Sequence, residues 1–259
     1  MRITVLGSGT STGIPVIGCT CATCMSTAPE NNRLRSSIYV EHPSVKFMVD
    51  CSLDFRQQAL RYRMPRIDAV ILTHDHADHI GGFDDLRGYN FIQQGPIDIY
   101  GTAAVFKTLR ERYAYCFRPA LQIGGGLPQL NLIEIEPGKA FQLGDLEILP
   151  VPIKHGLLDI VGYRVGKTFA YMTDCSFVPE TSVPMVDDIE NLIVGALRPT
   201  PHETHFSLPE ALEFSRSIRA GKTWFTHITD RLEYFATNAS LPPDAQLLHD
   251  GQVIEVETC

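Results

Sequence analysis

The chain has 259 residues, of which 44% are hydrophobic and 20% charged, and its formal net charge is −8. This composition is typical of a globular protein and excludes a disordered or fibrous chain, and the length permits a sizeable core without disulfides. The acidic balance argues against broad binding to nucleic acids or anionic membranes, although it is compatible with one basic pocket.

No run of about 18 apolar residues is present, so the sequence predicts no membrane-spanning helix. The N-terminus carries one basic residue and a very short apolar run, which is typical of a first strand rather than a signal peptide. We therefore expect a cytoplasmic protein.

Short runs rich in β-branched or aromatic residues predict strands along the whole chain. In chain order they are Ile3–Leu6, Val45–Val49, Ala69–Leu72, Ile97–Tyr100, Leu146–Leu149, Thr168–Met172, Leu192–Val194, Thr223–Thr226 and Val253–Val256.

Three segments predict helices: Leu53–Arg63 before Pro65, Ala103–Tyr115 after the N-cap Thr102, and Leu208–Ala220 after a capping box of Ser207 and Glu210. A glycine-rich loop is expected at 123–128. Strands with interspersed helices indicate an α/β layered fold. With no linker in sight, residues 1–259 are expected to form one domain.

Seven cysteines are present, and three of them crowd into a short loop: Cys19, Cys21 and Cys24. In a reducing compartment such a cluster indicates metal binding more than a disulfide framework. Tetrahedral zinc would require a fourth ligand from elsewhere in the chain. Three reduced cysteines in a buried loop are the alternative interpretation.

The densest chemical signal is the run THDHADH at positions 73–79, directly after an expected strand. An extended backbone points His74 and His76 to one side, while Asp78 and His79 lie at the turn into the next segment. Imidazole and carboxylate suit Zn²⁺, Mn²⁺ or Fe²⁺. Asp75 either supports the ligands or is an ordinary solvated residue.

Four more expected strands end in a candidate ligand, a position from which a rigid scaffold can aim side chains at one point. These candidates are Asp50, His155, Asp174 and His227.

With these separated residues, the THDHADH run resembles the metallo-β-lactamase fold family of hydrolases. The resemblance covers essentially the whole chain and implies a four-layer αββα sandwich with a binuclear metal site at one edge. It implies a first metal on His74, His76 and His155. It implies a second metal on Asp78, His79 and His227, with Asp174 bridging the two metals. Asp50 would brace the histidine loop from behind.

The expected cofactors are two divalent ions, Zn²⁺ or Mn²⁺. Two such ions can hold a bridging hydroxide that attacks phosphorus or a carbonyl carbon, and they can neutralise the charge that builds up. Asp78 and Asp174 would thus serve catalysis. Redox relatives carry Glu where this chain has His76, which favours hydrolase chemistry.

The loops GSGTSTGIP at 7–15 and GCTCATC at 18–24 further resemble the phosphoribosyl cyclic phosphate phosphodiesterases, the PhnP-like group. In that group the three cysteines help to hold a structural zinc, with a histidine three residues after the last catalytic histidine. This chain has Asp230 at that position, which makes a Cys₃Asp site the expectation. Glu233 and Tyr234 also depart from the group pattern.

The same resemblance gives His205 a functional role, such as protonating the leaving oxygen or holding phosphate, which suits general acid catalysis. His202 is expected to be an ordinary loop residue. Arg33, Arg35 and Arg87 are candidates for a phosphate-binding patch, and Arg35 and Arg87 are retained as substrate-binding candidates.

The leading hypothesis is a hydrolase of a small cyclic phosphodiester, with a small-molecule substrate and no membrane or nucleic-acid partner. A homodimer is compatible with the sequence. A thioester or lactone hydrolase is the main alternative. A non-catalytic relative such as PqqB and an RNA-processing nuclease rank below it.

Overall fold

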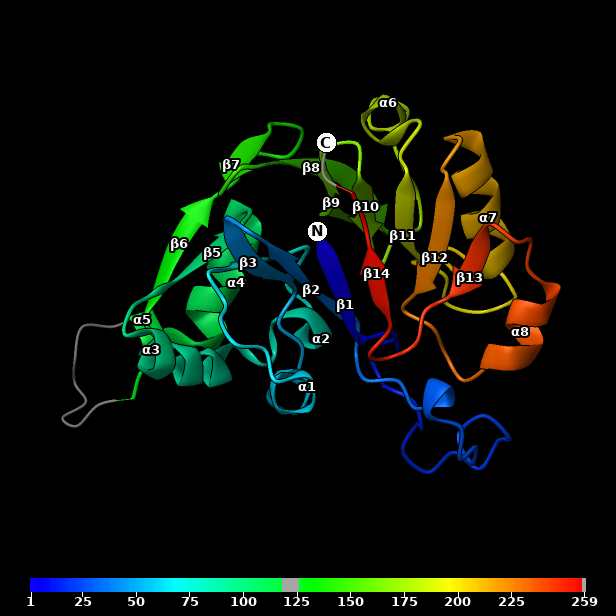
Figure 1. Cartoon of the computed structure of the whole chain (residues 1–259), viewed down its shortest axis with the longest axis horizontal. Helices are drawn as coiled ribbons and strands as arrows, with labels where there is room; N and C mark the ends of the chain where they lie inside the picture. Colours follow the sequence, from blue (N-terminus) through cyan, green and yellow to red (C-terminus); the bar gives the residue numbers. More distant parts are fainter. Residues whose placement is uncertain (118–125, 258–259) are drawn as a thin grey trace.

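In the computed structural model, which describes residues 1–117 and 126–257, two sheets pack face to face and helices cover both outer faces (Figure 1). This is the four-layer αββα sandwich that the sequence predicts. The two ends of the described chain lie close together, because β1 and β14 are neighbours in one sheet and the amine of Met1 donates to the Val256 carbonyl at 2.8 Å.

Each sheet has seven strands among the described residues. The first has the order β14-β1-β2-β3-β4-β5-β6, and the second has the order β13-β12-β11-β10-β9-β8-β7. The strands are β1 (Arg2–Gly7), β2 (Ser37–His42), β3 (Val45–Val49), β4 (Ala69–Ile71), β5 (Ile97–Gly101), β6 (Leu130–Glu134), β7 (Phe141–Leu143), β8 (Leu146–His155), β9 (Leu158–Val165), β10 (Phe169–Met172), β11 (Asn191–Gly195), β12 (Lys222–Thr226), β13 (Ala245–Leu247) and β14 (Val253–Glu255).

Along the chain the helices alternate with strands. In space they cover the outer faces of the sheets or lie at the edge where the strands end. They are α1 (Phe55–Tyr62), α2 (Ala77–Ile80), α3 (Arg87–Gln93), α4 (Ala103–Arg112), α5 (Ala114–Phe117), α6 (Val183–Val186), α7 (Leu208–Ser217) and α8 (Tyr234–Ser240), with 3₁₀ turns η1 (Pro29–Asn31) and η2 (Phe83–Leu86).

Three apolar clusters correspond to the three interfaces between the four layers. The central cluster joins the inner faces of both sheets and includes Phe47, Tyr163 and Phe169. One outer cluster seats α1, α3 and α4 on the first sheet, and the other seats α6, α7 and α8 on the second. The strands that carry the candidate ligands are therefore anchored on both faces, which makes their ends rigid.

The predicted helices form, with corrected ends. Thr102 caps α4 and accepts a hydrogen bond from the Val105 amide, but the helix ends at Arg112 rather than continuing to residue 115. The capping box of Ser207 forms as predicted at α7, which ends at Ser217, short of the predicted residue 220. Within the loop expected at 123–128, positions 123–125 lie outside the described residues.

The strand predicted to end at Leu149 continues to His155, in spite of Pro150 and Pro152. Beyond Ile148 this strand pairs with β9 alone. A proline is tolerated there because its missing N–H faces no partner strand.

Parallel pairing brings the candidate ligands to one edge of the sandwich. β3 and β4 are parallel in the first sheet, and β10, β11 and β12 are parallel in the second, so their carboxyl ends lie together. In the described part of the chain, no helix is both long and apolar enough to cross a membrane.

Candidate metal centre

Seven histidine and aspartate side chains from both sheets converge at this edge. His74 and His76 follow β4, and Asp78 and His79 lie in α2. His155 ends β8, Asp174 comes two residues after β10, and His227 directly follows β12. The seven are the metal-ligand candidates of the sequence: His74, His76, Asp78, His79, His155, Asp174 and His227. Their donor atoms form two groups within which all distances are at most 4.8 Å.

Three residues of this edge adopt a left-handed backbone conformation that side chains other than glycine rarely take. The φ angles are 62° at Asp50, 54° at Asp174 and 56° at His227; Asp50 and His227 directly follow a strand, and Asp174 comes two residues after one. Such conformations cost free energy and persist where surrounding structure enforces them, commonly at functional sites. The sharp turn lets each side chain leave its strand toward the common centre.

The first group consists of His74, His76 and His155. The Nδ1–H of His155 donates to the Thr204 carbonyl at 2.6 Å, which leaves Nε2 free to face the centre. The imidazole rings of His74 and His76 have centroids 4.6 Å apart, and those of His76 and His155 lie 5.1 Å apart. Three imidazoles in this arrangement match the nitrogen ligands of a divalent metal.

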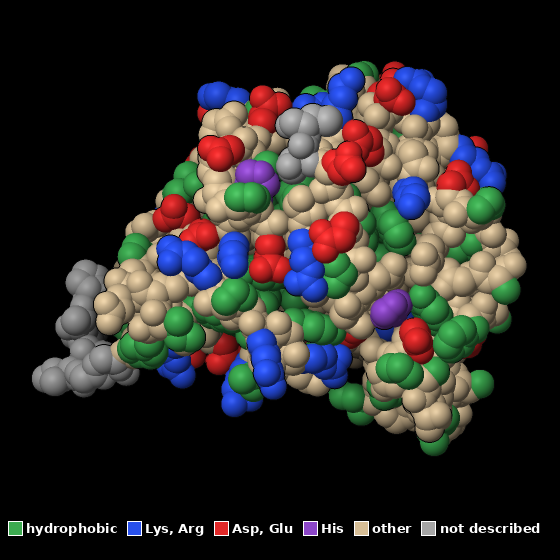
Figure 2. Space-filling view, viewed as in Figure 1, with side chains coloured by type: hydrophobic (Ala, Val, Ile, Leu, Met, Phe, Trp, Pro, Cys, Tyr) green, Lys and Arg blue, Asp and Glu red, His purple; other side chains and the backbone are tan. Residues whose placement is uncertain are grey.

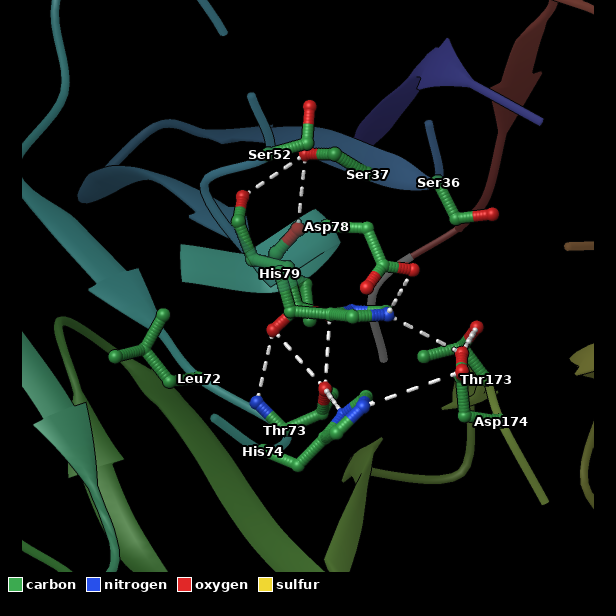
Figure 3. A network of polar contacts seen from close by, with 12 residues as sticks. Ser36, Ser37, Ser52, Leu72, Thr73, His74, Asp78, His79, Thr173 and Asp174 are labelled. Atoms are coloured by element: carbon green, nitrogen blue, oxygen red, sulfur yellow. Dashed lines mark hydrogen bonds and ion pairs between the residues drawn. The ribbon is translucent and has the colours of Figure 1, made fainter. Parts of the chain in front are cut away.

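The second group consists of Asp78, His79, Asp174 and His227, and all four are buried. His79 Nε2 lies 3.2 Å from Asp78 Oδ2 and 3.4 Å from Asp174 Oδ1 (Figure 3). His227 Nε2 lies 3.2 Å from Asp174 Oδ2. Asp174 also faces the first group, because its Oδ2 lies 4.0 Å from His74 Nε2. Asp174 is thus placed where a bridging ligand would lie.

Asp50 lies behind the histidines in the position expected of a bracing residue. Its carboxylate accepts hydrogen bonds from the Thr73 amide at 2.8 Å and from His79 Nδ1 at 2.7 Å. The Thr73 hydroxyl also donates to Asp50, so it can accept from Nδ1 of His74 at 3.0 Å. This relay leaves Nε2 of both His74 and His79 facing the centre.

Unpaired polar atoms show that the residues fit metal ions. The buried Nε2 atoms of His74, His79 and His227 have no hydrogen-bond partner among the described residues. A buried polar group without a partner costs free energy, and metal ions at the two groups would satisfy all three nitrogens.

The ionised carboxylates of the second group also favour the binding of cations. Burial alone would raise the pKa of Asp174, but His227 and His79 hold it well below its usual range. Burial opposes protonation of His79, yet Asp174, Asp50 and Asp78 together raise the pKa of this histidine well above its usual value. Clustered carboxylates that stay ionised favour a divalent cation among them.

His205 lies against the metal-ligand residues, in the loop before α7. Its Nδ1 is 3.8 Å from Asp174 Oδ2, and its ring stacks on that of His227 with centroids 4.9 Å apart. Together with His155 and Asp174 it forms a further group of potential ligands. Burial lowers the pKa of His205 to about 3. A phosphate oxyanion beside the ring would raise this pKa again.

The cysteine loop and Asp230 come together as the sequence predicts, although they are more than 200 residues apart. The donor atoms of Cys19, Cys21, Cys24 and Asp230 all lie within 4.8 Å of one another, and Cys21 Sγ is 3.3 Å from Asp230 Oδ2. Amides of the same loop donate to all three sulfurs. Sulfur atoms this close match the tetrahedral ligand shell of zinc, with Zn–S bonds of about 2.3 Å.

The three candidate arginines have different surroundings. Arg33 is buried and donates to the carbonyls of Thr229 and Leu232, so it holds a loop. Arg35 pairs with Asp54 at 2.9 Å and donates to the Ser11 carbonyl. Arg87 is exposed, pairs with Asp84 and lines a different pocket, on α1 and α3. None of the three lines the cavity beside His205.

That cavity has a volume of about 520 Å³ and extends from His205 toward the cysteine loop. It is lined by Thr10, Ser11, Thr12, Leu197, Arg198, Pro199, Thr200, His202, His205, Thr229, Asp230 and Arg231. Arg198 and Arg231 were not among the residues predicted from the sequence to have a role. Their one available signal was proximity in sequence to His202, His205 and His227.

The comparisons with known proteins agree with this geometry. Residues 46–228 match the model of the beta-lactamase superfamily domain. A solved structure described as a new diphosphatase from the PhnP family is 38% identical in sequence to this chain and superposes with a TM-score of 0.92. The alignment covers 100% of this chain and 98% of that protein.

Two curated relatives match over part of their length. An octanoyltransferase of Porphyromonas gingivalis is 34% identical over 254 residues, which are 97% of this chain and 51% of the relative. A ribonuclease Z of Methanopyrus kandleri is 28% identical over 53% of this chain and 46% of the relative. The chain thus spans about half the length of these relatives.

Proposed function

Because the chain belongs to the beta-lactamase superfamily, we propose that its edge site is a binuclear metal centre that hydrolyses a phosphoric ester or anhydride of a small molecule. The observation that carries this proposal is the convergence of seven donor side chains with three buried, unpaired imidazole nitrogens. The substrate class is favoured by the likeness to a PhnP-family diphosphatase along the whole chain. A ring-opening reaction on a ribosyl cyclic phosphate is the form expected from the sequence.

The residues divide between two metal ions, Zn²⁺ or Mn²⁺. His74, His76 and His155 would hold one, Asp78, His79 and His227 the other, and Asp174 would face both. Divalent ions at such a site activate water and neutralise charge on the attacked oxygens.

The protein groups around the metals position and protonate the substrate. His205 stands beside Asp174 at the mouth of the cavity, where an imidazole can donate a proton or hydrogen bond to a departing oxygen. Asp50 and Thr204 fix the orientation of His79 and His155. The cavity exceeds the size of one phosphate group and admits a small-molecule substrate.

A panel of substrates tests this function. Protein reconstituted with Zn²⁺ or Mn²⁺ would be given a ribose cyclic phosphate, a diphosphate diester, an octanoyl thioester and a lactone. We expect turnover of the phosphorus substrates, and a loss of at least about 10²-fold in Asp78→Ala.

Asp75→Asn is the matched control for Asp78→Ala. Asp75 belongs to the same sequence motif, but its carboxylate accepts a hydrogen bond from Thr108 and joins none of the ligand groups. Its activity should stay near that of the unmodified protein. Full activity of Asp78→Ala, or no turnover of either phosphorus substrate with metals bound, would contradict the proposal.

A thioester or other carbonyl ester hydrolase is the second candidate. The observation that favours it is the likeness to a protein named octanoyltransferase, since acyl transfer acts on a carbonyl carbon. The donor set itself suits either electrophile. Turnover of the octanoyl thioester alone in the panel would select this candidate.

A further inference from the structure

The ring of His227 is held differently from those of two other buried histidines of the site. Nδ1 of His79 and Nδ1 of His155 each donate to an oxygen acceptor. Nδ1 of His227 is buried and has no hydrogen-bond partner among the described residues. The direction in which its Nε2 atom points therefore depends on where the backbone places the side chain.

The backbone that follows His227 is hydrogen-bonded in both directions to an N-terminal segment. The Ile228 amide donates to the Ser8 carbonyl at 3.0 Å, and the Thr10 amide donates to the Ile228 carbonyl at 3.1 Å. At His227 itself the φ of 56° lies in the left-handed region, which persists only where the surrounding structure enforces it. Residues 8–10, which we call the strap, supply part of that enforcement.

The strap joins the ends of the two sheets. Gly9 forms one β-bridge with Arg35, directly before β2, and another with Ile228, after β12. Its amide also donates to the Leu34 carbonyl at 2.8 Å. A Cβ atom on Gly9 would lie 2.8 Å from the Arg33 carbonyl oxygen, so only glycine fits there. The glycine-rich motif at the start of the chain thus permits this close approach of backbones.

Asp250 fixes the strap to the first sheet. Its Oδ1 accepts from the amide and the hydroxyl of Ser8, both at 2.9 Å, and its Oδ2 accepts from the Leu34 amide at 2.7 Å. The side chain is 3% exposed, and its one ion pair among the described residues, with Arg61, spans 3.8 Å. Burial raises the pKa of Asp250 to about 7, against the hydrogen bonds from Leu34 and Ser8. These donors offset part of the cost of burying the carboxyl group.

The turn that carries Asp250 is itself anchored on β1. The Gly251 amide donates to the Val5 carbonyl at 2.8 Å, and the Val5 amide donates to the Gln252 carbonyl at 2.9 Å. β1 lies inside the first sheet, between β14 and β2. The carboxylate therefore has a fixed position from which it holds the strap.

We propose that Asp250 is a positioning residue for His227, because through the strap it fixes the backbone that aims the His227 ring at the second metal-ligand group. Asp250 itself belongs to none of the ligand groups. The inference deepens the proposed function and rests on it for the presence of metal ions, but not for the reaction that they support. It also gives the strap a role in the site.

A zinc titration followed by NMR tests the proposal. With ¹⁵N in the histidine rings, the signals of His155 and His227 report binding at the first and second groups separately, and a chelator sets the free zinc concentration. In Asp250→Asn the side chain keeps its size but turns N–H groups toward amides that need an acceptor. The zinc affinity at His227 should fall about 10- to 100-fold, while the affinity at His155 stays near that of the unmodified protein.

The metal-free protein gives a second readout. The ring signals of His227 should shift in Asp250→Asn while those of His155 stay in place, whereas a general loss of stability would not single out one histidine. Asp68→Asn is the matched control. Its carboxylate likewise accepts from a backbone amide, that of Lys46 at 2.8 Å, but it holds no residue of the strap.

Ser8→Ala keeps the proposal testable if Asp250→Asn does not fold. It removes the hydroxyl donor and leaves the Ser8 amide bonded to Asp250, so the affinity at His227 should fall by only about 2- to 10-fold. Equal losses at His155 and His227, or no loss at His227 in the variants that fold, would overturn the inference.

These measurements separate the inference from the proposed reaction. A selective loss at His227 supports it even if no phosphorus substrate is turned over. If no zinc binds, the proposed function fails, and the metal-free spectra still decide whether Asp250 positions His227. Turnover of phosphorus substrates with equal zinc binding in Asp250→Asn and the unmodified protein would overturn the inference and leave the proposed function standing.

Discussion

A relay of hydrogen bonds determines which nitrogen the buried histidines present to the centre. Asp50 accepts from Thr73 and from His79, and Thr73 lies within hydrogen-bond distance of His74. Each bond occupies an Nδ1 atom, so Nε2 is the atom left for a metal. Orientation of His74 and His79 therefore depends on one carboxylate that belongs to neither metal-ligand group and does not line the cavity beside His205.

Asp50→Asn should weaken metal binding about 10- to 100-fold while leaving the fold intact. Asparagine tolerates the left-handed φ of 62° at this position, so the backbone need not change. Competition with a chromophoric chelator measures the affinity, and circular dichroism checks the fold. Asp68→Asn, at a carboxylate that holds the Lys46 amide, is the control. Unchanged affinity in Asp50→Asn would contradict the relay.

At this scale the sequence predicted residue types and spacing well. The THDHADH run and three of the four strand-terminal residues indicated all seven ligand candidates, and the structure brings them together. The supporting groups escaped prediction for physical reasons. Every residue has a backbone carbonyl, so the sequence does not mark the Thr204 carbonyl as the partner of His155. Whether Arg231 finds an ion-pair partner depends on which side chains the fold places around it.

The segment from Thr229 to Leu232 contributes to two sites, the cysteine group and the cavity beside His205, which the sequence did not link to each other. It carries Asp230 to the cysteine loop and Arg231 to the cavity, while buried Arg33 holds both of its ends. Burial lowers the pKa of Arg33 to about 10, so its guanidinium stays charged at neutral pH. A metal on the cysteine loop would thus stabilise one wall of the cavity beside His205.

Metal content tests the cysteine group. The intact chain should bind one more zinc ion than Cys21→Ser or Asp230→Ala. The Tm of each variant should be at least about 5 °C lower than that of the intact chain. Elemental analysis gives the zinc count and calorimetry the Tm. Cys116→Ser is the control, because Cys116 lies in α5, outside the group. An equal zinc count in Cys21→Ser and the intact chain would refute a metal at this loop.

Elements with strong local signals were predicted, and elements defined by tertiary packing were not. The Thr102 N-cap, the Ser207 capping box and the β-branched runs identified α4, α7 and nine strands. β9 was missed because Gly162 interrupts its apolar run. A Cβ there would lie 2.9 Å from the Tyr171 carbonyl, so the glycine permits close packing on β10. Such an approach of two backbones is invisible in a single sequence.

At the scale of the whole molecule, the candidate centre exists only because the two sheets pack together. The first sheet and its α2 supply Asp50, His74, His76, Asp78 and His79. The second supplies His155, Asp174 and His227. Neither half holds a complete ligand group, so metal binding and packing of the sheets are thermodynamically coupled.

The surface of the molecule is consistent with a small-molecule substrate. On the face in Figure 2, basic and acidic side chains are interspersed rather than separated by sign. The face in this view shows no extended basic track of the kind that binds a nucleic acid backbone.

The most direct test of the central claim is ³¹P NMR of the zinc- or manganese-loaded protein in ¹⁸O-enriched water, with a ribose cyclic phosphate and a diphosphate diester as substrates. The account predicts cleavage with one ¹⁸O atom on phosphorus, seen as an isotope shift and absent in Asp78→Ala. With full metal content, failure to place ¹⁸O on phosphorus in either substrate would contradict it.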